Sequence, residues 1–214
     1  MSRVRKTIVF DFGNVLIGLD FEKSFLAFEK ILNVDWSDRK VPERISNAIL
    51  LYDKGLISDE NFIDYFKTFN PDAHYNDLVT AWNYLIGDMP EHRFDFLEDL
   101  KDDYDLAILS NINNLHLQCV HNYLDNNHNI NNFEDRYFKS VFYSHQIGMR
   151  KPENDIYLHV QKELDCLPDH ILFIDDMEQN INAAHKHGWK AALHLPADSI
   201  ELKLSDYISQ TRFD

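Results

Sequence analysis

Short apolar runs recur along the chain, and each is bounded by polar or turn-forming residues. Five of them have the length of a buried β-strand: Thr7 to Phe10, Leu106 to Leu109, Ser140 to Tyr143, Ile171 to Ile174 and Trp189 to Leu193. Helix-like stretches lie before and between the later strands, at 91–103, 113–124, 153–165 and 178–187. This alternation predicts an α/β fold, a Rossmann-like, three-layer α/β/α core in which helices cover both faces of a parallel sheet.

The segment 19–89 has a different pattern, without a convincing buried strand. Apolar residues from Phe21 to Leu32 recur at helical spacing, and similar patterns cover 41–53, 59–69 and 75–85. About four helices are enough for a small bundle. Because the segment directly follows the first strand, whose carboxyl end is where ligands bind, we expect it to cover the active site. An extra structural subdomain would give the same pattern.

These patterns divide the chain into two expected domains. Residues 1–18 and 90–214 are predicted to form the Rossmann-like core, and residues 19–89 a helical cap of the four-helix-bundle type.

Polar residues that could take part in catalysis or ligand binding follow four of the predicted strands. They are Asp11, Ser110, Asn111, Lys151, Asp175 and Asp176. In a parallel, doubly wound sheet the carboxyl ends of the strands lie side by side, so residues far apart in the sequence converge on one pocket.

Carboxylates at two of these strand ends predict a metal site. A lone aspartate after a strand, such as Asp11, is more often a turn or cap residue, but the matching groups at the other strand ends favour a catalytic carboxylate. Gly13 permits a tight turn and a close approach of the backbone to a ligand. Asp175 and Asp176 are adjacent carboxylates and suit a hard cation such as Mg²⁺, although acids also gather at helix N-termini.

Groups suited to an anion follow the other two strands. Ser110 and Asn111 could cap a helix or hold phosphate oxygens. Lys151 lies in G-M-R-K-P, where Arg150 adds a second positive charge and Pro152 stiffens the loop. A solvated pair of surface cations is the alternative interpretation.

The charge balance argues against a nucleic-acid partner. The 214 residues include 21 Lys and Arg against 36 Asp and Glu, a formal net charge of -15. A protein that binds the phosphate backbone needs a basic face. We therefore expect a small-molecule substrate; if it is anionic, a metal ion and local cations must reverse the field inside the site.

Cysteine usage and hydropathy bear on the cellular location. Cys119 and Cys166 form no C-x-x-C pair, which argues against a disulfide framework or a zinc site. No run of about eighteen apolar residues occurs, and Asp11 interrupts the apolar stretch near the start. The sequence predicts a cytoplasmic protein without a membrane span.

Four motifs occur in the order and spacing of a known superfamily. They are F-D-F-G-N-V-L, L-S-N, G-M-R-K-P and F-I-D-D-M-E-Q-N. Together they resemble the signatures of the haloacid dehalogenase (HAD) superfamily, subfamily IA, over residues 5–18 and 91–195. The wording G-N-V, with S-N-I-N-N-L-H and S-H-Q-I-G-M-R-K-P-E, is most similar to bacterial alpha-D-glucose-1-phosphate phosphatases.

The resemblance implies a role for each matching residue. Asp11 would be the nucleophile that forms a phospho-aspartate, Ser110 and Lys151 would bind the transferring phosphoryl group, and Asp176 would hold Mg²⁺ with Asp11. The backbone carbonyl of Gly13 would join the metal. Of the supporting residues, Asp175 would flank the site, and Asn180 would orient the metal ligands.

One departure from the pattern concerns proton transfer. Most phosphatases of this superfamily carry a second Asp two residues after the nucleophile as general acid and base, and Gly13 occupies that position here. We expect water, the substrate or a residue of the cap to protonate the leaving group. Substrates whose leaving oxygen needs little help, such as a sugar 1-phosphate, would be favoured.

Two other functions remain open at this point. A haloacid dehalogenase shares the fold and the aspartate nucleophile and also lacks the second Asp, but it attacks carbon and has no use for a metal. A non-catalytic binding protein would keep the pocket without turnover. Asp175 and Asp176 argue against the first, and retention of the other motif residues argues against the second.

Overall fold

Five parallel strands form a single sheet in the part of the chain that the structure, a computed structural model, describes, residues 5–213. The strands are β1 (Thr7–Phe10), β2 (Asp105–Ser110), β3 (Ser140–Tyr143), β4 (Ile171–Asp175) and β5 (Lys190–Leu193), in the order β3-β2-β1-β4-β5. Phe10 lies level with Ile108 of β2 and Ile174 of β4, so the residues that come next in the sequence, Asp11 and Asp175, reach the same height. The predicted strand positions are confirmed.

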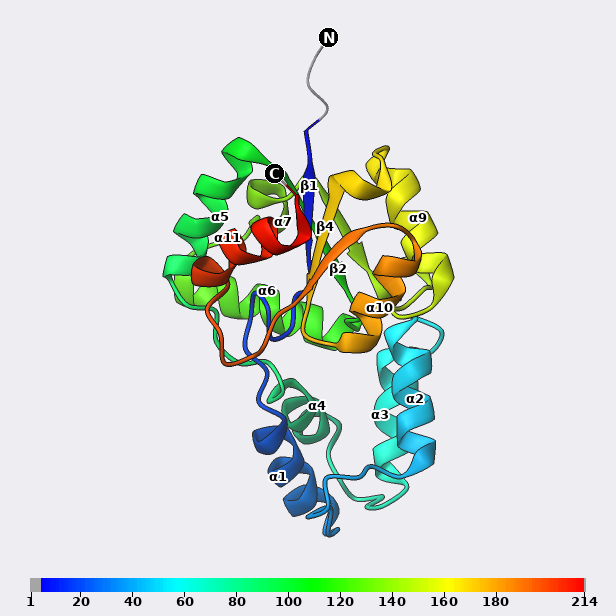
Figure 1. Cartoon of the computed structure of the whole chain (residues 1–214). Coiled ribbons are helices and arrows are strands. Elements are labelled where there is room, and N and C mark those ends of the chain that lie inside the picture. Colours follow the sequence, from blue (N-terminus) through cyan, green and yellow to red (C-terminus); the bar gives the residue numbers. More distant parts are fainter. Residues whose placement is uncertain (1–4, 214) are drawn as a thin grey trace.

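Helices cover both faces of this sheet, and the predicted three-layer, Rossmann-like core is confirmed (Figure 1). On one face lie α5 (His92–Asp103), α6 (Asn114–His128), α7 (Phe133–Tyr137) and α11 (Ile200–Thr211). The other face carries α9 (Asn154–Leu164) and α10 (Glu178–Lys186). Along β1, Ile8 and Phe10 enter the first layer and Val9 enters the second, because successive side chains of a strand point to opposite faces.

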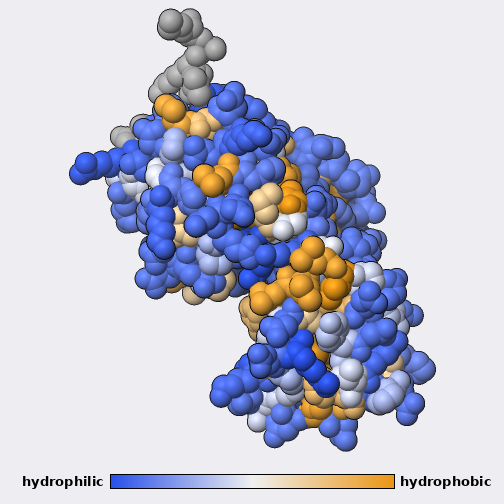
Figure 2. Space-filling model, turned by 90° about the vertical axis from the view of Figure 1, so that its right-hand side faces the viewer, coloured by the Kyte–Doolittle hydropathy of each residue, from blue (hydrophilic) through white to orange (hydrophobic). Residues whose placement is uncertain are grey.

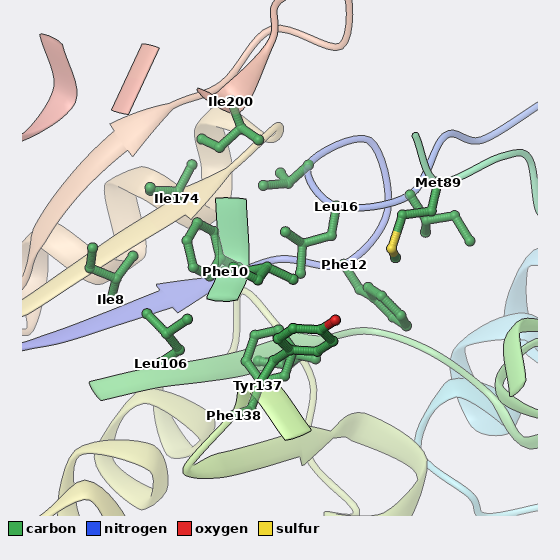
Figure 3. Close-up of a cluster of buried hydrophobic side chains, with 14 of the residues drawn as sticks. Ile8, Phe10, Phe12, Leu16, Met89, Leu106, Tyr137, Phe138, Ile174 and Ile200 are labelled. Atoms are coloured by element: carbon green, nitrogen blue, oxygen red, sulfur yellow. The ribbon is translucent and has the colours of Figure 1, made fainter. Parts of the chain in front are cut away.

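Each face of the sheet carries one hydrophobic cluster, and the larger of the two reaches the loop that follows β1. Figure 3 shows Phe10, Phe12 and Leu16 packed with side chains from the neighbouring strands and from the helical layer. Phe12 is 1% exposed and its ring stacks near that of Phe133, 6.0 Å between centroids. The chain on either side of Asp11 is therefore anchored in the core, which fixes where this carboxylate lies.

Four helices project from one end of the sheet and form a separate bundle (Figure 1). They are α1 (Phe21–Leu32), α2 (Glu43–Asp53), α3 (Asp59–Lys67) and α4 (Tyr75–Asn83), and we call them the α1–α4 bundle. The bundle has its own aromatic cluster, in which Phe28 stacks on Phe66 and Tyr52 stacks on Phe62. Figure 2 shows hydrophobic side chains gathered on the bundle where it meets the core. The exact domain boundaries stay a prediction.

The bundle joins the core through two linkers that pair with each other. Gly18 N–H donates to the carbonyl of Asp88, and Gly87 N–H donates to the carbonyl of Gly18, at 3.0 and 2.9 Å. Leu19 and Ile86 form an isolated antiparallel bridge next to these bonds. Both linkers therefore leave the core together, directly beyond the loop that follows β1.

Within residues 5–213, three α-helices have no counterpart in the sequence-based expectations. Two are short, α7 and α8 (Ser144–Ile147), and lie on either side of β3. The third, α11, packs Ile200, Leu204 and Tyr207 against the sheet. Ile200, Leu204, Tyr207 and Ile208 recur at i, i+4, i+7 and i+8, so the helical pattern of α11 is present in the sequence. None of the helices in the described residues is long and apolar enough to cross a membrane.

A glycine in the turn between α2 and α3 carries the first prediction. Gly55 has φ of +66°, and a Cβ at this position would overlap the carbonyl oxygen of His145 in α8. Gly148 also has a positive φ, +70°, but a Cβ there would meet nothing within 4 Å. Left-handed strain on an alanine costs about 1 kcal/mol at either position. We expect Gly55→Ala to lower the free energy of unfolding by about 1 to 2 kcal/mol more than Gly148→Ala, because only Gly55→Ala adds a clash with backbone. Urea unfolding of both variants measures this, and equal losses would contradict it.

Candidate active site

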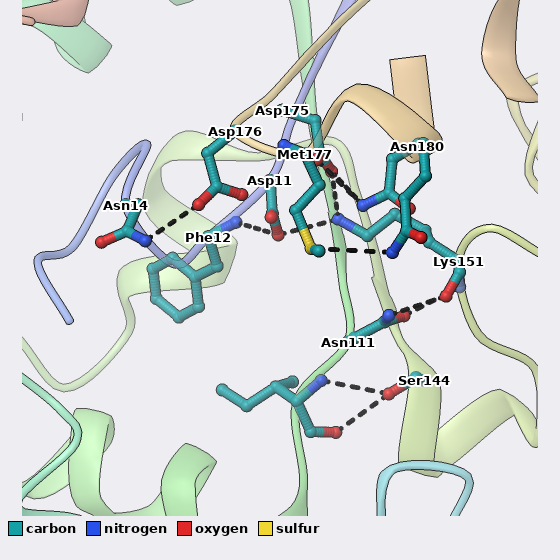
Figure 4. A network of polar contacts seen from close by, with 12 residues as sticks. Asp11, Phe12, Asn14, Asn111, Ser144, Lys151, Asp175, Asp176, Met177 and Asn180 are labelled. Atoms are coloured by element: carbon teal, nitrogen blue, oxygen red, sulfur yellow. Dashed lines mark hydrogen bonds and ion pairs between the residues drawn. The ribbon is translucent and has the colours of Figure 1, made fainter. Parts of the chain in front are cut away.

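The carboxyl ends of β1 and β4 and the loop after β3 place Asp11, Lys151 and Asp175 in direct contact (Figure 4). Asp11 N–H donates to the carbonyl of Ile174 at 2.8 Å. The pairing of β1 with β4 therefore continues up to Asp11 and Asp175. This is the position where ligands bind in an open parallel sheet whose strand order reverses.

A buried ammonium group lies between two carboxylates. Lys151 Nζ is 2.9 Å from Asp11 Oδ1 and 2.6 Å from Asp175 Oδ2, and the residue is only 1% exposed. Burial lowers the pKa of Lys151, but the two carboxylates outweigh it and the net effect is a raised pKa. Lys151 is therefore held as a cation, because two anions share its charge.

The two carboxylates at the end of β4, Asp175 and Asp176, differ in how many hydrogen bonds their oxygens accept. Asp175 is fully buried; its Oδ1 accepts from Met177 N–H and from Asn180 Nδ2, and its Oδ2 accepts from Lys151. Asp176 is only partly buried, and Asn14 Nδ2 donates to its Oδ2 at 2.8 Å. Asp175 thus anchors the lysine, whereas Asp176 keeps an oxygen available for a metal ion.

Asp11 lies among like charges. The net effect of its surroundings raises its pKa from 3.8 to about 7: burial raises it most, Lys151 opposes this, and the charges of Asp175 and Asp176 add to the rise. Phe12 N–H also donates to its Oδ1 at 2.6 Å. A divalent cation beside this group would favour the ionised carboxylate that a nucleophile requires.

The donor set fits a magnesium ion. Asp11, Asp175 and Asp176 each offer a carboxylate oxygen, and these oxygens lie within 4.8 Å of one another. Mg²⁺ prefers a few oxygen ligands and retains several waters, and the charge of a cation would relieve the repulsion that raises the pKa of Asp11. Both oxygens of Asp175 are engaged, whereas Lys151 and Phe12 N–H contact only Oδ1 of Asp11, so Asp11 and Asp176 are the residues that would bind the metal.

The remaining sequence-predicted residues also lie at this end of the sheet. Ser110 ends β2 and is 3% exposed. Asn111 holds the main chain of Lys151, since its Nδ2 donates to the lysine carbonyl and its Oδ1 accepts from the lysine N–H. Asn180 donates to both oxygens of Asp175. Phosphate binding by Ser110 and Asn111 and metal binding by the Gly13 carbonyl stay predictions.

Space next to Gly13 is filled by an apolar side chain. A Cβ at this position would lie 2.8 Å from Leu19 Cδ1. A side chain at position 13 would therefore require Leu19 to move, and the contact is with the end of a flexible side chain rather than with backbone. Leu19 thus packs directly on the glycine that follows Asp11 by two residues.

Two groups of polar residues near the site were not anticipated from the sequence. Asn14, with φ of 56°, holds Asp176, and its position in a G-N turn was a usable signal because Asn tolerates this conformation. The second group joins the α1–α4 bundle to the core: Asn113 Nδ2 donates to Asp53 Oδ1 at 3.4 Å and faces His116 Nδ1 at 3.2 Å. Arg150 Nη2 lies 3.8 Å from Asp53 Oδ2.

Comparison with known proteins places this fold and site in one class. The family model described as haloacid dehalogenase-like hydrolase matches residues 5–188. The chain therefore belongs to the haloacid dehalogenase-like hydrolases, and the resemblance carried by the four motifs is confirmed.

Individual relatives come from several organisms. A D-ribitol-5-phosphate phosphatase from Bacteroides thetaiotaomicron is 24% identical over 188 residues, 86% of this chain and 89% of its own. A sesquiterpene phosphatase from Aspergillus oryzae is 40% identical over 58 residues, 27% of this chain and 29% of its own.

Solved structures share the arrangement of both parts of the chain. A HAD family enzyme from Bacteroides thetaiotaomicron, in complex with magnesium and inorganic phosphate, is 26% identical with a TM-score of 0.79 and covers 91% of this chain and 96% of its own. A HAD-like family hydrolase from Porphyromonas gingivalis is 25% identical with a TM-score of 0.81, over 96% and 98%. A 2-haloacid dehalogenase from Pseudomonas syringae, 14% identical with a TM-score of 0.60 over 96% and 99%, shares the fold alone.

Asp53 carries a prediction on stability against pH. Its burial raises the pKa from 3.8 to about 6, with Arg150 and Asn113 opposing the shift. Because the pKa is raised in the folded state, the contribution of Asp53 to stability is fully present below about pH 4 and is lost as the pH rises through about 6. Replacing the carboxylate by an amide, Asp53→Asn, removes this dependence.

The quantity to measure is the free energy of unfolding of Asp53→Asn minus that of wild type. We expect this difference to increase by up to about 3 kcal/mol as the pH rises from 4 to 7, because only wild type loses the contribution of Asp53 to stability over this range. Urea unfolding across this range measures it. Asp125→Asn, at an exposed carboxylate, is the control and should show no such trend. A stability difference for Asp53→Asn that is independent of pH would contradict the prediction.

Proposed function

We propose that the protein is a magnesium-dependent phosphatase that hydrolyses small phosphate monoesters through a phospho-aspartate on Asp11. The observation that carries this proposal is the contact between Lys151 and the carboxylates of Asp11 and Asp175, beside Asp176. A cation and a carboxylate cluster in one buried site suit phosphoryl transfer, which needs positioning and charge neutralisation above all.

Each residue has a defined part in this reaction. Asp11 attacks phosphorus with one carboxylate oxygen, the bond from phosphorus to the ester oxygen breaks, and the alcohol leaves with a proton taken from solvent or substrate. A water molecule then attacks the phosphorus of the acyl phosphate and releases inorganic phosphate, which restores the carboxylate. Lys151 neutralises charge on the phosphoryl oxygens, and Ser110 and Asn111 help to orient them.

Magnesium, when bound by Asp11 and Asp176 with the carbonyl of Gly13, would neutralise phosphoryl charge and keep Asp11 ionised. Asn14 and Asp175 then act indirectly, since Asn14 orients Asp176 and Asp175 positions Lys151. Asn180 holds Asp175 in turn. These supporting contacts fix the reacting groups before the substrate arrives, which is how such sites lower the barrier.

On leaving-group chemistry alone, the narrower substrate candidates are sugar phosphates, alpha-D-glucose 1-phosphate first. Gly13 leaves no acid at the usual position, and an anomeric oxygen needs less protonation than an ordinary alcohol. The names of the relatives point to different alcohols, a pentitol phosphate in one case and a sesquiterpene in the other. We propose that the substrate is a small molecule, with no role for nucleic acid, and that the protein acts in the cytoplasm.

A dehalogenase and a non-catalytic binding protein are less well supported. A dehalogenase has no use for the carboxylate cluster formed by Asp11, Asp175 and Asp176. A binding protein has no need of a nucleophile that is held by a lysine. Chloride release from 2-haloacids, measured beside phosphate release, separates the first from a phosphatase.

Phosphate release tests the proposal directly. We expect Mg²⁺-dependent release of inorganic phosphate from at least one of alpha-D-glucose 1-phosphate, D-ribitol 5-phosphate and p-nitrophenyl phosphate, with loss of activity in EDTA. Asp11→Asn removes the nucleophile and should lower kcat by at least about a thousandfold. Release that persists in Asp11→Asn, or that ignores EDTA, would overturn the mechanism.

Metal binding can be measured without turnover. Mg²⁺ should raise the melting temperature of wild type, since a ligand at a hundred times its Kd adds about 2.7 kcal/mol of stability. Asp176→Asn should lose most of this shift, whereas Asp125→Asn should keep it, because Asp125 is exposed and outside the cluster. An undiminished shift in Asp176→Asn would rule out Asp176 as a ligand.

A further inference from the structure

A cavity of about 350 Å³ lies within the α1–α4 bundle and opens toward the core. Its lining includes residues of α1, α2 and α4, together with Asn111, Asn113 and His116 of the core. The volume falls in the range of about 300 to 1,000 Å³ that is typical of ligand pockets and has room for on the order of ten water-sized groups.

Two lining residues connect this cavity to the catalytic groups. Asn111 lines the cavity, and its side chain makes two hydrogen bonds to the main chain of Lys151. Leu19 also lines the cavity, and its Cδ1 lies against Gly13, two residues after Asp11. Asp11, Lys151, Asp175 and Asp176 do not themselves line the cavity, but through Leu19 and Asn111 it adjoins the groups that would hold a phosphate ester.

The lining is dominated by apolar side chains, several of them aromatic. The aromatic members are Phe21, Phe25, Phe28, Trp36, Phe66 and Trp82, and aliphatic residues such as Ile45 and Ile49 complete the wall. Burying apolar surface here is worth about 25 cal/mol per Å². Aromatic walls further favour a flat ring, because offset and edge-to-face contacts add to the burial.

Most of the polar groups in the lining are already paired within the protein. Ser24 Oγ donates to the carbonyl of Ala81, and Asn113 Oδ1 accepts from Trp82 Nε1 and from His116 N–H. His116 Nε2 lies 3.0 Å from the carbonyl of Trp82.

The other two polar lining residues are engaged as well. Asn111 binds the main chain of Lys151, and Asp53 accepts from Asn113. Few donors or acceptors remain for the hydroxyl groups of a sugar, and a buried hydroxyl without a partner is strongly disfavoured.

We infer that this cavity receives the alcohol portion of the substrate and that the preferred substrates are phosphate monoesters of apolar, aromatic alcohols rather than of sugars. The inference rests on the proposed phosphatase activity. Leaving-group chemistry agrees with it, since a phenolate departs with little protonation and Gly13 supplies no acid. Leu19 links the two features, because the side chain that packs on Gly13 also forms part of the apolar wall.

A series of para-alkylphenyl phosphates tests the inference. The alkyl chain leaves the pKa of the leaving phenol nearly constant while it adds apolar surface. We expect kcat/KM to rise about threefold for each added methylene until the cavity is full, and phenyl phosphate to exceed alpha-D-glucose 1-phosphate. A flat series, or a sugar phosphate that is preferred over every aryl ester, would overturn the inference while the phosphatase activity stood.

Matched variants on α2 separate the cavity from general effects. Ile49 lines the cavity, whereas its neighbour Leu50, 42% exposed, does not. Ile49→Gln should abolish the dependence on chain length, and Leu50→Gln should keep it. If Ile49→Gln fails to fold, Phe21→Ser at the 53% exposed rim should weaken the dependence in its place. Unchanged slopes in the folded cavity variants would contradict the assignment.

A binding measurement keeps the test independent of turnover. Trp36 and Trp82 line the cavity, so their fluorescence reports on an occupant. We expect 4-butylphenylphosphonate to bind at least tenfold more tightly than phenylphosphonate and to change this fluorescence. Absence of phosphate release from every ester, together with such binding, would reject the proposed function but support the cavity; equal affinities would reject the cavity.

Discussion

The site depends on one buried ammonium group. Lys151 is almost fully buried, so its charge is tolerated only because Asp11 and Asp175 share it. Removing either carboxylate would leave an unbalanced charge in the core, and removing the lysine would leave the carboxylates to repel each other. The supporting hydrogen bonds from Asn111 and Asn180 serve this pairing, since one fixes the main chain of the lysine and the other fixes its anchor.

The parallel sheet makes this pairing possible. Asp11 and Asp175 are far apart in the sequence, yet the level register of β1 and β4 brings them to the same edge. The α1–α4 bundle is inserted directly after that edge, and its two linkers pair with each other beside Leu19. Leu19 packs on Gly13 and also lines the cavity, so one side chain lies between the cavity and the loop that carries Asp11.

Much of this arrangement could be predicted from the sequence because strands, helices and catalytic residues each leave a local pattern. The apolar runs predicted the strands, and the polar residues at the strand ends predicted the candidate site. Helix α11 was missed although Ile200, Leu204 and Tyr207 have helical spacing; only its burial against the sheet is a tertiary property without a local pattern. The pairing of Asp53 with Asn113, and the mutual pairing of the polar groups that line the cavity, join the bundle to the core and have no local pattern.

The central claim is that Asp11 attacks phosphorus. The most direct measurement is to mix the protein with Mg²⁺ and a turned-over ester, quench in acid within the first turnover, and analyse the peptides by mass spectrometry. The account predicts that the peptide containing Asp11 gains the mass of one phosphoryl group, and that the gain disappears in Asp11→Asn. Phosphate release in the first turnover without this gain, or with a phosphoryl group on another residue, would contradict it.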